Sequence, residues 1–263
     1  EAREHVVRAD LSEFGVGELK QWPDTFRGYA GWPELFFNGQ PMQLARWPNE
    51  GYAEIAEVLD RGSVPRQGET DDRPGVFRYS GERPERWLSA PEVYLNGYWC
   101  FKWYDEVIRV GEIDAETDTI TMAAPHHYGV GGRSGGLYYA MGLLEELDLP
   151  GEYHVDRDNG VVYFYPPEAM EGAEIGLSTL SETMITVEDA AFVTLRDLTL
   201  EFSQARAVKV TGGEANEIAG CTVRNMARDA ISVSGGSDHL VTGCNVSNMG
   251  QNGISIRANI FII

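Results

Sequence analysis

The sequence predicts an all-β protein: a right-handed parallel β-helix with three strands and 23 residues per rung, preceded by a β-rich insertion domain. The main observation is a repeat of short apolar alternations, which end in turn at Val187, Val210, Val233 and Ile256. A unit of this length is too short for a strand–helix–strand crossover and buries its apolar positions only by stacking on copies of itself. We expect the right hand because parallel crossovers are almost always right-handed.

Other apolar positions recur at the same interval and complete the three strands: Leu195, Ile218 and Val241; Leu198, Cys221 and Cys244; Leu200, Val223 and Val246. Glycine pairs at 212–213 and 235–236 mark the turns between strands. Successive rungs lie about 4.8 Å apart, a separation that a disulfide between Cys221 and Cys244 would tolerate. The sequence is therefore compatible both with two stacked reduced thiols at Cys221 and Cys244 and with a disulfide between them.

The second observation is a change of composition near residue 150, because all six tryptophans lie in the first 103 residues. We expect residues 1–150 to form the β-rich insertion domain, with the first few residues as a possible strand of the helix, and residues 151–263 to form its N-terminal rungs. Hairpins are expected at residues 33–42, with Asn38-Gly39 as a primed turn, at 107–122 and at 152–165.

The chain ends within a rung, in an apolar tail without a polar cap. Because an open rung is an unpaired sheet edge, we expect either that the natural protein continues past residue 263 or that this edge pairs with another chain in self-association.

Composition disfavours several partners. A net charge of −20 repels phosphate backbones, so no nucleic acid is expected. No run of about 18 apolar residues exists, so no membrane span is expected. Three cysteines do not make a disulfide framework. We expect no metal and no cofactor, and a neutral partner is easier to accommodate than a polyanion.

The best candidate site is a row of polar residues that directly precede one strand of each rung: Arg206, Asp229 and Asn252. Stacking would place them about 4.8 Å apart on the outside of the helix. Asp229, the only carboxylate of the row, is the candidate catalytic residue, and Arg206 and Asn252 are candidate substrate-binding residues. The alternative is that Asp229 pairs with Arg206 or caps a turn.

Glycoside hydrolysis normally needs two carboxylates, about 5 to 5.5 Å apart for retention and roughly 6.5 to 9.5 Å apart for inversion. Two rungs beyond Asp229, a partner would fall outside this chain. A complete carboxylate pair is therefore not expected within these residues.

A loop with His126 and His127 beside Tyr128 is a weaker candidate. Adjacent residues point to opposite sides of a strand, so both are not expected on one metal. They could contact sugar hydroxyls as substrate-binding residues, or they could be structural. Within the aromatic segment 94–104, residues 98–104 alternate as in a strand, which places Trp99, Phe101 and Trp103 on one face. That face is expected to be core, whereas an exposed Trp or Tyr from the other face could stack on a sugar ring.

Several longer motifs carry a family resemblance: Glu34-Leu-Phe-Phe-Asn-Gly-Gln-Pro-Met-Gln-Leu-Ala-Arg-Trp-Pro-Asn49, Gly81-Glu-Arg-Pro-Glu-Arg-Trp87, Leu95-Asn-Gly-Tyr-Trp99, Leu144-Glu-Glu-Leu-Asp-Leu-Pro-Gly-Glu-Tyr153 and Tyr163-Phe-Tyr-Pro-Pro167. In these motifs the chain resembles the β-helix proteins of glycoside hydrolase family 141, which carry a β-barrel-like insertion domain near the start of the helix. The resemblance implies fucosidase or xylanase types of activity, secretion, and acidic catalytic residues on rungs that this chain barely reaches.

The sequence thus predicts a secreted carbohydrate-active protein, extracellular or periplasmic, whose partner is a poly- or oligosaccharide. A glycoside hydrolase with an incomplete active site in this chain is the first interpretation. A polysaccharide lyase acting on uronates and a non-catalytic glycan-binding β-helix are the alternatives.

Overall fold

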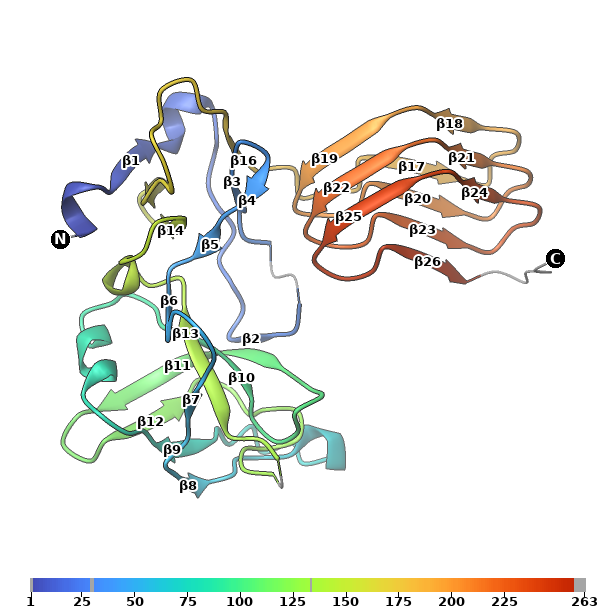
Figure 1. The fold of residues 1–263 in the computed structure, drawn as a ribbon. Coiled ribbons are helices and arrows are strands. Elements are labelled where there is room, and N and C mark those ends of the chain that lie inside the picture. Colours follow the sequence, from blue (N-terminus) through green and yellow to red (C-terminus); the bar gives the residue numbers. More distant parts are fainter. Residues whose placement is uncertain (1, 29–30, 133, 258–263) are drawn as a thin grey trace. The chain divides into compact units, whose positions relative to one another are not determined.

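The computed structural model describes residues 2–28, 31–132 and 134–257, and it divides the chain into two compact units (Figure 1). The first unit contains residues 1–30 and 42–173, and the second contains residues 31–41 and 174–263. We describe each unit by itself.

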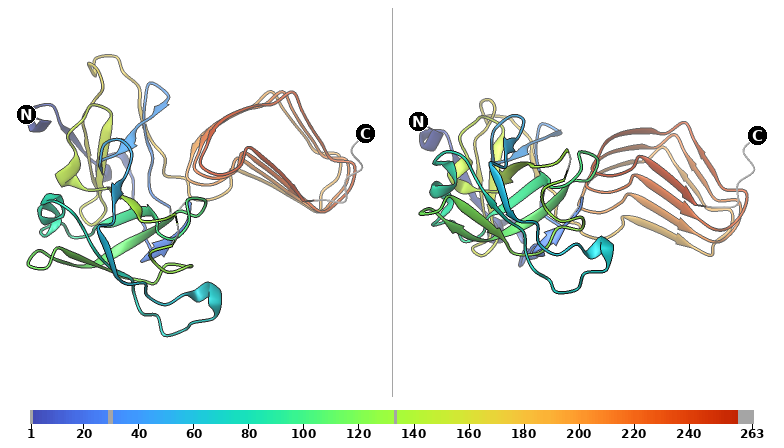
Figure 2. Two further views of the ribbon diagram at one scale, coloured as in Figure 1. Left: turned by 60° about the horizontal axis from the view of Figure 1, so that its bottom comes forward. Right: turned by 90° about the horizontal axis from the view of Figure 1, so that it is seen from below.

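The second unit is the predicted β-helix. Its rungs contribute strands to three parallel sheets, and Figure 2 shows the strands of successive rungs lying over one another. The first sheet contains β17 (Ile185–Glu188), β20 (Val208–Thr211), β23 (Ile231–Ser234) and β26 (Ile254–Arg257); the second contains β18 (Thr194–Arg196), β21 (Glu217–Ala219) and β24 (Leu240–Thr242); the third contains β19 (Thr199–Ser203), β22 (Thr222–Met226) and β25 (Asn245–Met249). In each of the three sheets, residues paired on successive rungs are 23 positions apart in the sequence, which confirms the predicted rung.

The apolar columns point into the coil. Val208, Val210, Ile231 and Val233 are all buried, and the cluster that they form includes Ile218, Cys221 and Val223. On the last described strand, Ile254 and Ile256 are 44% and 47% exposed, because no further described rung covers them. Cys221 and Cys244 are free thiols.

Residues with a left-handed backbone conformation, that is positive φ, recur at the same corners of successive rungs and turn the chain there. Asp189, Gly212 and Gly235 share one corner, with φ of 47°, 61° and 68°. Gly213 is required for a second reason, because a Cβ atom there would lie 1.9 Å from the carbonyl oxygen of Ala190 on the preceding rung. The glycine pairs of the sequence therefore mark corners where the backbone is left-handed or closely approached.

A hairpin from early in the sequence belongs to the β-helix unit. Strands β3 (Leu35–Phe37) and β4 (Gln40–Pro41) pair with each other, and β16 (Ile175–Leu177) pairs with β3. Asn38 and Gly39 both have positive φ, 49° and 74°, which confirms the predicted primed turn. The hairpin packs on the rungs: the Phe36 and Phe202 rings are 4.6 Å apart, and Asn225 Nδ2 donates to the Gly39 carbonyl at 2.9 Å.

The first unit is a mainly antiparallel β structure. One sheet contains β1 (Val7–Asp10), β15 (Val161–Phe164), β14 (Glu152–Asp156) and β5 (Gln43–Leu44); the larger sheet contains β6 (Arg46–Trp47), β13 (Leu137–Met141), β10 (Tyr94–Tyr98), β11 (Glu106–Asp114), β12 (Thr119–Met122), β9 (Val76–Arg78) and β8 (Glu57–Asp60), with β2 (Thr25–Phe26) on β11 and β7 (Ala53–Glu54) on β13. The unit also contains short 3-10 helices: η1 (Ala2–Glu4), which precedes β1, and η2 (Leu11–Phe14), η3 (Pro65–Gln67), η4 (Arg83–Trp87) and η5 (Leu144–Glu146), which lie between strands.

The core of this unit gathers large rings, including Phe77, Trp87, Trp99 and Tyr138. The predicted hairpins β11–β12 and β14–β15 are confirmed. Within the described residues, β6 and β8 are the two end strands of the larger sheet, and they do not pair with each other. The sheet is therefore open along this path and does not close into a barrel.

The boundary between the compact units differs from the composition change near residue 150. The hairpin β14–β15 lies in the first unit because β15 pairs with β1 over Val7–Asp10, far away in sequence. Whether residues 1–150 fold independently as an insertion stays a prediction. Within the described residues, no helix has the length and apolar character that would let it cross a membrane.

Candidate functional site

The predicted polar row exists on the β-helix. Arg206, Asp229 and Asn252 lie just before β20, β23 and β26, and the 23-residue rung brings them side by side. Arg206 Nη2 donates to Asp229 Oδ2 at 3.1 Å. Asn252 donates to Asp229 Oδ1 through its side-chain Nδ2 at 2.9 Å and through its backbone N–H at 3.2 Å.

The burial of this row differs from the expectation of an external catalytic carboxylate. The Asp229 side chain is only 8% exposed, and its two oxygens accept three hydrogen bonds from the neighbouring rungs. Buried charges need such donors to offset desolvation. These hydrogen bonds join three successive rungs, and we call the row Arg206, Asp229 and Asn252 the clasp. They fit the alternative interpretation, in which Asp229 pairs with Arg206. The catalytic role of Asp229 stays a prediction.

Arg206 has little freedom to act as a base. Its guanidinium is paired with Asp229, and its Nε is buried without a hydrogen-bond partner among the described residues. A polysaccharide lyase needs a free base beside the uronate, so this geometry does not favour the lyase alternative.

The two histidines have different environments in the first unit. The His126 side chain is 0% exposed, and its Nδ1 lies 2.6 Å from the Gly129 carbonyl oxygen. Because a carbonyl can only accept, Nδ1 carries the proton. Burial lowers the pKa of His126 to about 4. The expected contact between His126 and a sugar hydroxyl does not fit this burial.

A buried carboxyl group lies beside His126. Glu106 Oε2 is 3.4 Å from His126 Nε2 and accepts the backbone N–H of His127 at 3.2 Å. Burial raises the pKa of Glu106, so burial favours the neutral forms of both groups. The His127 ring is only half-buried and stacks on Tyr104 at 5.6 Å. Of the two predicted contacts, only that of His127 remains sterically open.

Five rings form a cluster that we call the aromatic platform: Phe101, Trp103, Tyr104, His127 and Tyr128. The alternation of residues 94–104 suggested a continuous strand. However, β10 ends at Tyr98, and the Tyr104 N–H donates to the Phe101 carbonyl at 3.1 Å in a turn. Trp103 is consequently exposed, and sequence alternation could not identify this turn.

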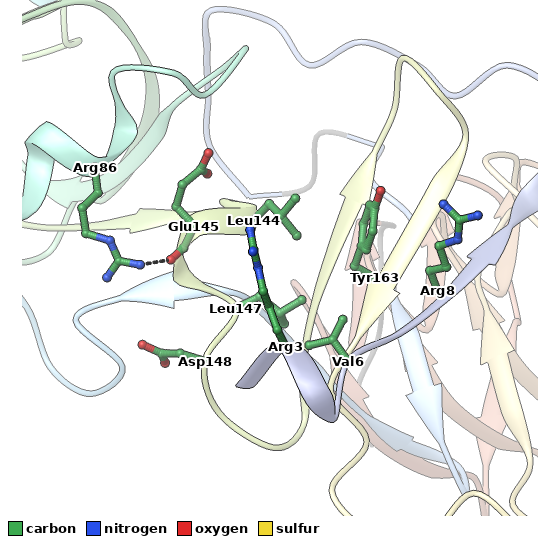
Figure 3. Close-up of a pocket in the computed structure, with 9 residues that line it drawn as sticks. All are labelled: Arg3, Val6, Arg8, Arg86, Leu144, Glu145, Leu147, Asp148 and Tyr163. Atoms are coloured by element: carbon green, nitrogen blue, oxygen red, sulfur yellow. Dashed lines mark hydrogen bonds between the residues drawn. The ribbon is translucent and has the colours of Figure 1, made fainter. Parts of the chain in front are cut away.

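The first unit also contains a cavity of about 730 Å³ (Figure 3). Its lining is Arg3, Val6, Arg8, Arg86, Leu144, Glu145, Leu147, Asp148 and Tyr163. Arg86 Nη2 donates to the Glu145 carbonyl at 2.6 Å. Charges of both signs share the cavity, which suits a small polar molecule but does not define a chemical class. The lining comes from four separate segments, so no local motif could reveal it.

The sequence analysis did not identify one further carboxyl group with a shifted pKa, that of Glu34. Burial raises the pKa of Glu34, in the β-helix unit, to about 7. The Glu34 backbone N–H donates to Ser178 Oγ at 2.8 Å, beside the β16–β3 pairing. No pattern in the sequence distinguishes this carboxyl group from exposed ones.

Among the described residues there is no group of three or more His, Cys, Asp or Glu that could hold a metal ion.

Comparisons with known proteins agree with this architecture. A family model described as a right handed beta helix region matches residues 183–260. A solved structure titled "Glycoside hydrolase" is similar over 96% of this chain, with a TM-score of 0.66 and 15% sequence identity. A search among curated proteins finds no match.

The chain spans 53% of that glycoside hydrolase. At this identity the likeness shows the fold alone. The chain is therefore a right-handed β-helix preceded by an antiparallel β-rich region, with the fold of a known glycoside hydrolase.

Proposed function

We propose that this chain is part of a secreted glycoside hydrolase that acts on plant or other complex polysaccharide. The observation that supports it best is the extent of the structural likeness, which covers 96% of the chain. A structural likeness limited to the rungs would be expected for any β-helix protein. This likeness also covers the β-rich region that precedes the rungs. The substrate that fits a chain of net charge −20 is a neutral glycan.

We propose one member of the catalytic carboxylate pair. Asp229 is the candidate, as nucleophile or base, and the proton donor is proposed to lie in the part of such a hydrolase that this chain does not span. Hydrolysis with one carboxylate alone lacks either the acid or the nucleophile. We therefore expect weak or absent turnover by residues 1–263 and turnover by the complete protein.

The test measures hydrolysis by the complete protein on neutral plant polysaccharides and aryl glycosides. Release of reducing ends without unsaturated product supports the proposal. Unsaturated product would identify a lyase, and glycan binding without turnover would identify a binding protein.

The variant Asp229→Asn is compared with Asp238→Asn, which changes an exposed aspartate of the same unit. At a temperature where each variant is folded, a reacting carboxylate predicts a loss of at least a hundredfold in kcat for Asp229→Asn only. Unchanged kcat in folded Asp229→Asn would remove this residue from the mechanism and leave it as the clasp.

A further inference from the structure

Trp103 is the most exposed tryptophan of the first unit and the centre of the aromatic platform. It is 62% exposed, although the Trp22, Trp87 and Trp99 side chains are buried. Phe101 stacks on it, with ring centroids 5.3 Å apart and an interplanar angle of 13°. Tyr128 packs edge-on against both rings, at 5.4 Å and 5.5 Å. The indole is thus held by neighbours while much of its surface faces solvent.

Buried polar contacts hold the base of the platform in place. Glu106 Oε2 accepts the His127 N–H, and the Glu106 carbonyl accepts the Trp99 Nε1–H at 2.8 Å. His126 fixes the turn to Tyr128 through the Gly129 carbonyl. These contacts order the rings in advance, so a ligand that binds here loses little conformational entropy of the protein.

Charged groups border the rings. The Arg27 guanidinium lies 4.3 Å from the centre of the Tyr104 ring, and its Nε is 3.5 Å from Asp105 Oδ1. The Arg27 and Asp105 side chains are 50% and 43% exposed, so their remaining donors and acceptors can bind a ligand at the edge of the platform. Apolar faces combined with a few polar groups at the edge are typical of sites for small polar ligands.

We propose that the aromatic platform binds a neutral pyranose unit of a glycan, with the sugar ring stacked on Trp103. A pyranose presents an apolar C–H face, which suits an aromatic face, and hydroxyl groups at its edge, which suit Arg27 and Asp105. The acidic chain disfavours an anionic sugar. This inference goes beyond the proposed hydrolase because it requires neither the β-helix nor a catalytic carboxylate.

The experiment is native affinity electrophoresis of the chain in gels that contain hydroxyethylcellulose, arabinoxylan, galactomannan or polygalacturonate. We expect retardation by at least one of the three neutral polymers. Trp103→Ala should raise the apparent Kd at least tenfold. Phe14→Ala is the matched control, since Phe14 is 71% exposed in the same unit and lies outside the platform. It should leave retardation unchanged.

A second readout follows Trp103 directly. Acrylamide quenching of tryptophan fluorescence should decrease when the binding polymer is added to the wild-type chain, and this protection should be absent in Trp103→Ala. Both variants change exposed side chains, so melting temperatures should stay within a few degrees of the wild type.

Four results would overturn the inference: no retardation by any neutral polymer, retardation by polygalacturonate alone, full retardation of Trp103→Ala, or a wild-type dimer that Trp103→Ala converts to a monomer. The last result would make the platform a contact between two copies. Turnover by the complete protein is measured separately, so a hydrolase with an inert platform and a binding platform without a hydrolase give different results.

Discussion

At the scale of single residues, the row at Asp229 shows how a pattern can be found while its role stays open. The 23-residue interval predicted that Arg206, Asp229 and Asn252 lie side by side, and the hydrogen bonds of Asp229 confirm this. The burial of Asp229 could not be predicted, because it depends on how the side chains of the two neighbouring rungs pack over it. A polar residue at a strand start looks the same in sequence whether it is a clasp or a catalytic group.

The clasp itself predicts a stability effect. Asp229→Ala would leave the Arg206 guanidinium, which is largely buried, without its partner, and we expect a loss of about 3 kcal/mol in the free energy of unfolding. Glu182→Ala, at an exposed position of the same unit that does not have positive φ, should change it by less than about 0.5 kcal/mol. Urea denaturation of both variants measures this, and equal small effects would show that the clasp contributes little.

Glu34 predicts a dependence of stability on pH. Its pKa rises from 4.5 to about 7 on folding because of burial, so the folded state binds more protons between these values and loses stability as the pH rises through this window. Glu34→Gln removes the loss. We expect it to stabilise the protein by about 3 kcal/mol at pH 8 and not at pH 4.

Urea denaturation at both pH values measures the effect of Glu34→Gln. Glu182→Gln, at an exposed position of the same unit, is the control and should change stability little at either pH. A Glu34→Gln variant with the same effect at pH 4 and pH 8 would mean that burial does not control this carboxyl group.

At the scale of elements, periodicity and turn chemistry predicted what is local or repeated. The rung follows from apolar residues at a fixed interval, and the Asn38-Gly39 turn follows from two residues that accept positive φ. The platform turn at residues 101–104 was missed because its aromatic residues alternate as a strand would. The pairing of β1 with β15 was missed because it joins segments that share no sequence signal.

The register of the β-helix predicts opposite effects for two acidic substitutions in one sheet. Val210→Asp places an unpaired charge in the core, at a cost of several kcal/mol, and should prevent folding. Ser232→Asp places the same group on the outward side, opposite Lys209 in the register, and should be tolerated. Circular dichroism and thermal melting measure both, and a soluble, cooperatively melting Val210→Asp variant would contradict the inward orientation of this column.

At the scale of the whole molecule, the chain consists of two units, and each unit is built from two separate stretches of the sequence. The hairpin at residues 31–41 belongs to the β-helix unit, although residues on both sides of it belong to the other unit. Composition changes near residue 150 and so marks the start of the repeats only approximately. A boundary made by distant strand pairing leaves no trace in local composition.

This division predicts the behaviour of a chain that a protease has cut once. Residues 168–172 are exposed at the C-terminal end of the first unit and should be cut first in limited proteolysis. The two fragments should stay together in native size-exclusion chromatography, since β16 pairs with β3 and the Phe36 ring packs on Phe202. They should separate in urea. Fragments that elute apart under native conditions would contradict the assignment of residues 31–41 to the β-helix unit.

The most direct measurement of the central claim, that this chain belongs to a carbohydrate-active protein, is the binding of residues 1–263 to an array of plant and bacterial glycans. We predict binding to neutral oligosaccharides that soluble glycan of the same kind competes away. Absence of binding to every glycan by the folded chain, together with no hydrolysis by the complete protein, would contradict the claim and leave the likeness to a glycoside hydrolase as one of fold alone.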